Sequence, residues 1–213
     1  MTVKAKFLAV LAGFFLTLSS AAAAPVSFID NGTYTSDTQS GLEWLDVNLT
    51  AGRNYFDVSS ELGSGGEFEG WRYATAQEFL GLISNWTGIT VTVQHQVVFA
   101  EGLLDGLVSL LGPTSGGVFA EGSNNYFIRG VLADKVGDWH HQSAFIYDMD
   151  HVENDADYIY GNGGPYSDYS IEGKYGAFLV RDIAISAVPL PPAILMFGAA
   201  IIGLGLISRK RFH

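Results

Sequence analysis

Residues 70–86 read Gly-Trp-Arg-Tyr-Ala-Thr-Ala-Gln-Glu-Phe-Leu-Gly-Leu-Ile-Ser-Asn-Trp. Thr75 and Glu78 have the spacing of a capping box, in which each side chain bonds the backbone N–H of the other, so we expect a helix to begin at Ala76. The apolar face of this helix consists of Phe79, Leu80, Leu82, Ile83 and Trp86. An apolar stripe with helical spacing packs against a core. The stretch therefore predicts a core helix that is entered through the corner 70–75.

Before this helix, the sequence predicts two strands and a shorter helix. Val26–Asp37 alternates loosely, and Leu42–Leu45 follows it after a turn at residues 38–41. Apolar residues at helical spacing after Asn54, which can cap them, predict a helix of about two and a half turns. A Gly-rich acidic loop, 63–70, then leads to the corner.

After the core helix, leucines at helical spacing predict a second one over Leu103–Leu111, ended by Gly112-Pro113. Residues 90–97 are compatible with either strand or helix. The period then changes to that of strands, over Tyr126–Ala133, Gln142–Asp148 and Tyr175–Ile183. Helices in the first half and paired strands in the second predict one α+β domain with two to three helices and an antiparallel sheet.

Motifs within this domain resemble a known signature. Asp37-x3-Gly41-Leu42-Glu43-Trp44 and then Gly70-Trp71-Arg72 with Thr75 and Glu78 are similar to the "GL-W … WRLPT-x-x-E" pattern of Lcl-like domains, although Tyr73-Ala74 replaces Leu-Pro. These domains are relatives of the formylglycine-generating-enzyme and C-type-lectin-like folds, and they end on a strand as Phe178–Arg181 does here. The resemblance implies a binding or matrix role more often than catalysis. From the residues alone, we expect Trp44, Trp71 and Arg72 to be structural, with direct ligand contact as the alternative.

The end of the chain has the order of a membrane-sorting tail. Val188-Pro189-Leu190-Pro191-Pro192 precedes the apolar run Ala193–Ile207, and Arg209-Lys210-Arg211 follows it. With its flanks, the run predicts a transmembrane helix over about residues 190–208, with the basic residues on the cytoplasmic side. The alternative is a buried C-terminal core helix.

The start of the chain has the three parts of a secretory signal peptide. Lys4 and Lys6 precede an apolar run, Phe7–Leu18, which small residues follow. We therefore expect a signal peptide over residues 1–23 and an exported domain over residues 24–187, ahead of the tail 188–213. An uncleaved N-terminal anchor is the alternative.

The tail resembles the PEP-CTERM sorting signal of Gram-negative bacteria, except that Leu190 stands where the usual motif has Glu. The resemblance implies export, temporary anchoring in the inner membrane with the domain in the periplasm, and cleavage near the proline motif by an exosortase-type transpeptidase. It also implies a final place at the cell surface or in the extracellular matrix, among the exopolysaccharide of a biofilm.

Charge and cysteine content restrict the partners of the exported domain. Residues 24–187 contain all 22 acidic residues of the chain and only six of its basic residues. The net charge of this segment is therefore −16. Such a surface repels nucleic acid and anionic lipid, and it tolerates neutral or cationic polysaccharide. The chain has no cysteine, which excludes disulfides, zinc–thiolate sites and cysteine nucleophiles.

An acidic segment near the end of the domain has the donor atoms of a calcium site. Asp148, Asp150, Asp155 and Asp157 are the candidate ligands, since Ca²⁺ prefers dense carboxylate oxygens. Their spacing does not match an EF-hand. The alternative is a solvated acidic loop, and no other cofactor is indicated.

Histidines are the remaining candidates for chemistry, but no catalytic motif surrounds them. His140 and His141 are adjacent, so on a strand they point to opposite faces and do not chelate one metal; with His151 we expect them at surface or turn positions. Glycine-rich nucleophile, metalloprotease and P-loop motifs are absent from the sequence. We therefore expect a non-catalytic binding or structural protein, with an envelope hydrolase that uses His and Asp as the alternative.

Overall fold

The two ends of the domain meet in one antiparallel sheet. The computed structural model describes residues 27–118, 124–149 and 156–184. The last strand, β12 (Leu179–Asp182), lies between β3 (Leu42–Leu45) and β4 (Arg72–Tyr73). Two further strands complete the order β1-β2-β3-β12-β4, namely β1 (Phe28–Asp30) and β2 (Tyr34–Asp37).

A second sheet of seven strands is built on a long hairpin. β7 (Asn124–Gly137) pairs with β8 (His140–Met149) in antiparallel register, with irregularities between Val131 and Gly137. The central order is β11-β7-β8-β9-β5, with β6 beside β7 and β10 beside β8. The shorter strands are β5 (Gln96–Val98), β6 (Ser115–Val118), β9 (Tyr158–Tyr160), β10 (Pro165–Ser167) and β11 (Gly176–Ala177). Only β11 runs parallel to its neighbour, β7, among the pairings of the described strands.

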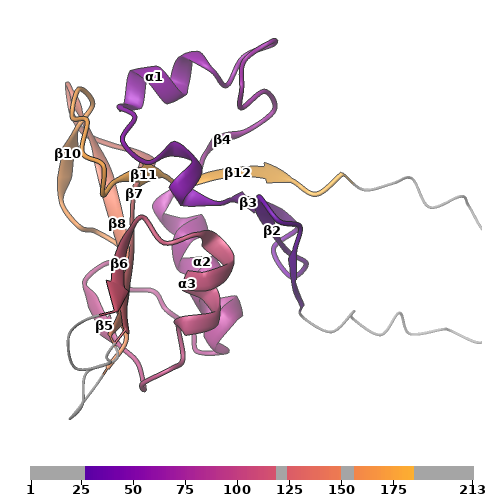
Figure 1. Cartoon of the computed structure of the whole chain (residues 1–213), viewed down its shortest axis with the longest axis vertical. Coiled ribbons are helices and arrows are strands. Elements are labelled where there is room, and N and C mark those ends of the chain that lie inside the picture. Colours follow the sequence, from indigo (N-terminus) through magenta and orange to yellow (C-terminus); the bar gives the residue numbers. More distant parts are fainter. Residues whose placement is uncertain (1–26, 119–123, 150–155, 185–213) are drawn as a thin grey trace, which may run out of the picture.

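Helices α2 (Ala76–Thr87) and α3 (Asp105–Leu111) cover one face of the seven-stranded sheet (Figure 1). Their apolar faces pack with both sheets in the main core, whose fully buried members include Phe79, Leu82 and Ile83 of α2, Leu107 and Leu111 of α3, and Ile128 and Ile146 of the sheet. Burying each such side chain contributes roughly 1.5–3 kcal/mol. The opposite face of the sheet is not covered by these helices.

A smaller core lies around α1 (Tyr55–Ser60) and the corner that precedes α2. Asn54 caps α1 by accepting a hydrogen bond from the backbone N–H of Asp57 at 2.9 Å. A 3₁₀ helix, Val47–Thr50, joins β3 to this region. The buried members of the smaller core are Leu45, Val58, Phe68, Trp71, Tyr73, Val131, Tyr166, Ala177 and Leu179.

The sequence predicted the mixed class and antiparallel pairing correctly, and the three α-helices of the described residues lie within the predicted two to three. The start of α2 at Ala76 and the strand Leu42–Leu45 are confirmed to the residue. The prediction of a single sheet was wrong, because strands from the two ends of the described domain form a sheet of their own. The predicted entry strand Val26–Asp37 is a hairpin, since a turn at 31–33 separates β1 from β2.

No helix within residues 27–118, 124–149 and 156–184 has the length and apolar character needed to cross a bilayer. The predicted signal peptide, 1–23, and the sorting tail, 188–213, lie outside the described residues. The same holds for Asp150, Asp155 and His151.

Candidate functional site

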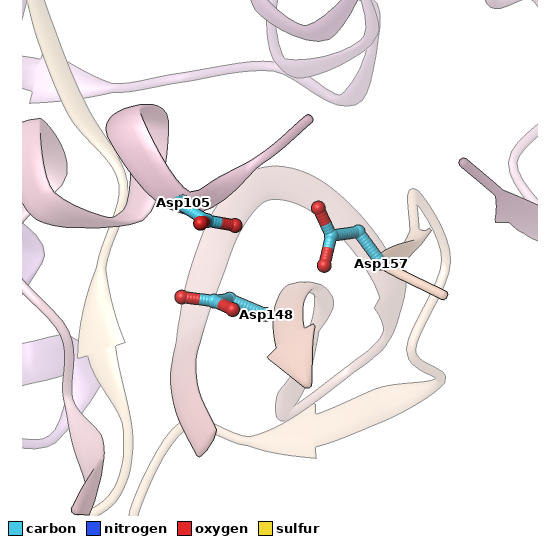
Figure 2. Close-up of side chains that lie close together, drawn as sticks. All are labelled: Asp105, Asp148 and Asp157. Atoms are coloured by element: carbon cyan, nitrogen blue, oxygen red, sulfur yellow. The ribbon is translucent and has the colours of Figure 1, made fainter. Parts of the chain in front are cut away.

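Three carboxylates gather where α3 begins, at the edge of the main core. Asp105, Asp148 and Asp157 each place a carboxylate oxygen within 4.8 Å of the others (Figure 2). Asp105 is exposed, whereas Asp148 and Asp157 are buried. We call these three residues the carboxylate cluster.

The cluster is positioned by three separate elements. Asp148 lies on β8, on the same face as the core residue Ile146, and Asp105 is the first residue of α3. Asp157 precedes β9, and its Oδ2 accepts the backbone N–H of Leu104 at 2.7 Å, which ties that strand to the start of the helix. Carboxylate oxygens at these distances suit a hard divalent cation such as Ca²⁺, whose remaining ligands would be water or backbone oxygens.

The sequence had identified two of the three residues of this cluster. Asp148 and Asp157 were predicted as metal ligands, and the structure brings them together. Asp105 was missed because it belongs to another element, far away in the chain. An acidic residue in the first turn of a helix is ordinarily explained by the helix dipole, so its type gave no separate signal.

His141 is buried, so the expected surface position was wrong for this residue. Its Nδ1 lies 2.7 Å from Oδ1 of Asp168, which is also buried. The ring of Tyr55 stacks on the imidazole with centroids 3.8 Å apart, and Tyr73 stacks on Tyr55 in turn at 4.4 Å. Burial raises the pKa of both tyrosines, that of Tyr73 far above its usual range. His140, the first residue of β8, is exposed.

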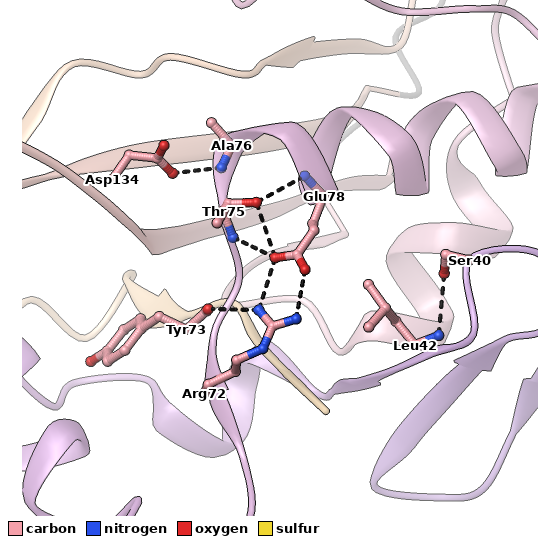
Figure 3. Close-up of polar contacts among 8 residues, drawn as sticks. All are labelled: Ser40, Leu42, Arg72, Tyr73, Thr75, Ala76, Glu78 and Asp134. Atoms are coloured by element: carbon pink, nitrogen blue, oxygen red, sulfur yellow. Dashed lines mark hydrogen bonds and ion pairs between the residues drawn. The ribbon is translucent and has the colours of Figure 1, made fainter. Parts of the chain in front are cut away.

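The residues of the 70–78 motif form one polar network at the start of α2 (Figure 3). Thr75 and Glu78 make the predicted capping box. The guanidinium of Arg72 donates a hydrogen bond to each carboxylate oxygen of Glu78, at 2.6 and 2.9 Å. Asp134 of β7 accepts the backbone N–H of Ala76 at 2.6 Å. Burial opposes the charge on Glu78, but the hydrogen bonds from Arg72 and Thr75 outweigh it and lower the pKa of this carboxyl. These contacts are structural.

The other residues of the 37–44 and 70–78 motifs form turns or pack in the two cores. Gly41 and Gly70 have φ values of +74° and +84°, which suit glycine. Leu42 and Trp44 of β3 are buried in the main core. Ser40 Oγ accepts the backbone N–H of Leu42 at 3.3 Å (Figure 3). Trp71 is buried in the smaller core, beneath Arg181 of β12.

Three aromatic side chains from distant parts of the chain lie together on the surface. Phe56, Trp139 and Tyr169 are 40%, 56% and 60% exposed, and their ring centroids are 5.0–6.5 Å apart. They come from α1, from the β7–β8 turn and from the segment after β10. We call them the aromatic cluster.

Backbone hydrogen bonds fix the three segments of the aromatic cluster to one another. Asp168 donates its N–H to the carbonyl of Trp139 at 3.0 Å and accepts the N–H of Tyr55 at 3.2 Å. The His141–Asp168 pair joins β8 to this junction and restrains it further. The rings are therefore presented on a rigid base. Because they come from distant parts of the chain, no local motif could have indicated them.

Comparisons with protein-family models, with curated proteins and with solved structures found no match to this chain. The resemblances of the tail and of the 70–78 motif therefore remain predictions, and the function is argued from the geometry.

Proposed function

We propose that this protein is an exported, non-catalytic glycan-binding component of an exopolysaccharide matrix. The sequence supports export and sorting through residues 1–23 and 188–213, which have the order of a signal peptide and of a PEP-CTERM-like tail. In this proposal, an exosortase-type transpeptidase at the inner membrane reads the tail. The domain then passes from the periplasm to the cell surface or matrix.

The aromatic cluster is the observation that carries the binding role. Large rings gathered on a protein surface expose apolar area to water, and such patches mark interaction sites. The C–H face of a pyranose is apolar and stacks on the electron-rich face of an aromatic ring. Phe56, Trp139 and Tyr169 offer three rings at contact distance from one another on a rigid base. Asp57 and Asp138 are their sequence neighbours, and these acids favour neutral or cationic sugars at this place.

The alternative, an envelope hydrolase that uses His and Asp, has one observation in its favour. His141 and Asp168 form a close pair of the kind that orients a general base. However, the imidazole is buried under the ring of Tyr55, and the neighbouring Ser143 hydroxyl donates to the carbonyl of Gly164 at 3.0 Å. We therefore propose that the pair supports the aromatic cluster.

Glycan binding by the full chain, purified in detergent, tests the proposed function. On an array of neutral and amino-bearing polysaccharides, we expect binding that Trp139→Ala and Tyr169→Ala each weaken about tenfold, because each ring supplies a stacking surface. Ile89→Ala, which removes an apolar side chain of similar exposure elsewhere, is the matched control. Unchanged binding in both aromatic variants, or no binding by the parent protein with or without EDTA, would remove the proposal.

Sorting is tested separately by mass spectrometry of the protein recovered from membranes and culture medium. We expect a mature N-terminus near residue 24 and a new C-terminus near the motif 188–192. A cytosolic product that ends in His213 and retains Met1 would contradict export. An exosortase gene near the gene for this chain would support the transpeptidase as the partner.

A further inference from the structure

The face of the seven-stranded sheet that points away from α2 and α3 is aromatic. Along β7 and β8, Ile128 and Ile146 are fully buried in the main core with the apolar residues of α2 and α3. The residues next to them on each strand point to the opposite face of the sheet. In register there, Phe127 lies opposite Tyr147 and Arg129 opposite Phe145. The neighbouring strand β9 adds Tyr158 and Tyr160.

The rings make a continuous layer across the three strands. The centroids of Phe127 and Tyr147 are 5.0 Å apart, and Tyr147 stacks on Tyr158 at 4.6 Å. Phe145 contacts Tyr160 at 6.1 Å. All five rings are half-buried, so each keeps part of its surface accessible.

Arg129 lies upon this layer. Its guanidinium carbon is 5.3 Å from the ring centroid of Phe127 and 5.4 Å from that of Tyr147, and its Nε donates to the Tyr147 hydroxyl at 3.3 Å. The Arg129 side chain is half-buried, and a guanidinium has four N–H donors besides the Nε–H that bonds Tyr147. Arg129 and Lys174 line one surface hollow of about 420 Å³, together with Ser115, Gly116 and Phe127.

The two cations differ from the paired basic residues of this acidic domain. Arg53, Arg72 and Arg181 each form an ion pair with a glutamate. Neither Arg129 nor Lys174 has a carboxylate oxygen within 4 Å among the residues that the structure describes. The domain contains 22 acidic and six basic residues. Two of these basic residues therefore lie beside the aromatic layer with no carboxylate close to them among the described residues, and they make this part of the surface locally positive.

We propose that this hollow, which we call the Arg129 site, binds a carboxylate-bearing sugar, such as a uronic-acid unit of an acidic polysaccharide. The carboxylate would pair with the guanidinium fork of Arg129 and the ammonium of Lys174. The C–H face of the sugar would lie on Phe127 or Tyr147. The inference rests on the proposed function for its polysaccharide setting, but its residues are separate from the aromatic cluster.

Charge density selects this ligand over a nucleic acid. Duplex DNA carries a negative charge about every 1.7 Å along its axis, which a domain of net charge −16 repels strongly. A uronic-acid polymer carries one charge per sugar, and screening over about 8 Å at physiological salt confines its repulsion to nearby acids. Glu172 is such an acid, because it lies two residues before Lys174 in the chain.

The test is calorimetric titration of the full chain in detergent with a galacturonic acid tetramer. The methyl ester of the same tetramer is the neutral control. We expect the acidic tetramer to bind and the ester to bind at least about tenfold more weakly, because the ester cannot form charge-assisted hydrogen bonds. A higher salt concentration should weaken binding of the acidic tetramer and leave binding of the ester unchanged.

Variants then locate the site. Arg129→Gln and Lys174→Gln should each weaken binding of the acidic tetramer about tenfold, Arg129→Lys should weaken it less, and Glu172→Gln should strengthen it. Lys135→Gln, which removes the same charge from β7 outside the hollow, is the matched control. Circular dichroism shows whether each variant is folded, and Lys174→Gln alters an exposed side chain, so it remains informative if Arg129→Gln does not fold.

Three outcomes would overturn the inference: equal binding of acid and ester, unchanged binding in the Arg129 and Lys174 variants, or stronger binding of a single-stranded oligonucleotide at the same residues. Trp139→Ala separates this inference from the proposed function. Loss of acidic binding in Trp139→Ala, with none in Arg129→Gln, would assign every glycan to the aromatic cluster. Loss in Arg129→Gln alone, with no neutral glycan bound, would leave the Arg129 site standing without the aromatic cluster.

Discussion

The guanidinium carbon of Arg181 lies 4.3 Å from the ring centroid of Trp71, so the last strand of the domain is fastened to the corner that precedes α2. The same side chain donates its Nε to Oε2 of Glu43 at 2.5 Å and lies 4.9 Å from the ring of Tyr34. One arginine therefore joins β2, β3, β12 and the corner. A planar guanidinium can stack and bond at once, and an ammonium cannot.

Arg181→Lys should lower the free energy of unfolding by about 1–2 kcal/mol, because lysine keeps the charge but loses the stacked fork. Urea denaturation followed by tryptophan fluorescence measures this change. Lys135→Arg is the control, since Lys135 is exposed and pairs with no carboxylate that the structure describes. Equal stability of Arg181→Lys and the parent would mean that Arg181 acts through its charge alone.

Thr75→Ala should destabilise the domain by about 1 kcal/mol, because the backbone N–H of Glu78 loses its acceptor at the start of α2. Thr75→Ser keeps the hydroxyl and should recover most of the loss. Thermal unfolding monitored by circular dichroism compares the three proteins. If serine and alanine are equally destabilising, the methyl group of Thr75 matters and the cap does not.

The sequence could predict those features of the fold that depend on neighbouring residues. A capping box and an apolar stripe are complete within one turn or two of α2, so the helix start at Ala76 was correct. The alternation of Phe127, Arg129, Phe145 and Tyr147 was equally visible in the sequence. The sequence did not show which face of the sheet these residues would present to solvent, because that depends on where α2 and α3 pack.

The rest depends on contacts between distant residues. Nothing near β12 indicates that it inserts between β3 and β4, since its partners are more than a hundred residues away. Asp105 joins Asp148 only because α3 begins above the end of β8. His141 is buried because Asp168 supplies a hydrogen-bond partner and the ring of Tyr55 stacks on the imidazole. Strands β9 and β10 were missed because three residues are too few for a periodic pattern.

Asp46→Asn should stabilise the domain at neutral pH. Burial, with a smaller contribution from Asp30, raises the pKa of Asp46 from 3.8 to about 6. The folded state therefore binds a proton more tightly than the unfolded state, so the ionised carboxyl is a cost above pH 6 that disappears as the pH falls toward 4. We expect the variant to be more stable by about 1 kcal/mol at pH 7.5 and no different near pH 4, after allowing for solvent screening. Urea midpoints at four pH values measure this, and a difference that does not change with pH would contradict it.

Calcium should stabilise the protein through the carboxylate cluster. Three carboxylate oxygens within 4.8 Å repel one another, and a divalent cation relieves that repulsion in the folded state alone. A cation at a hundred times its dissociation constant adds about 2.7 kcal/mol to the free energy of unfolding. We therefore expect CaCl₂ to raise the melting temperature above its value in EDTA. Asp105→Asn should abolish most of this response and raise the stability in EDTA, since it removes one exposed charge.

Asp57→Asn is the matched control for the calcium measurement, because Asp57 is likewise an exposed acid in the first turn of a short helix. This variant should respond to calcium as the parent does. An equal rise in melting temperature in the Asp105 variant would place the ion elsewhere. No rise in the parent would mean that the cluster is a solvated acidic group, and Asp157 would then serve to hold the start of α3 through the backbone N–H of Leu104.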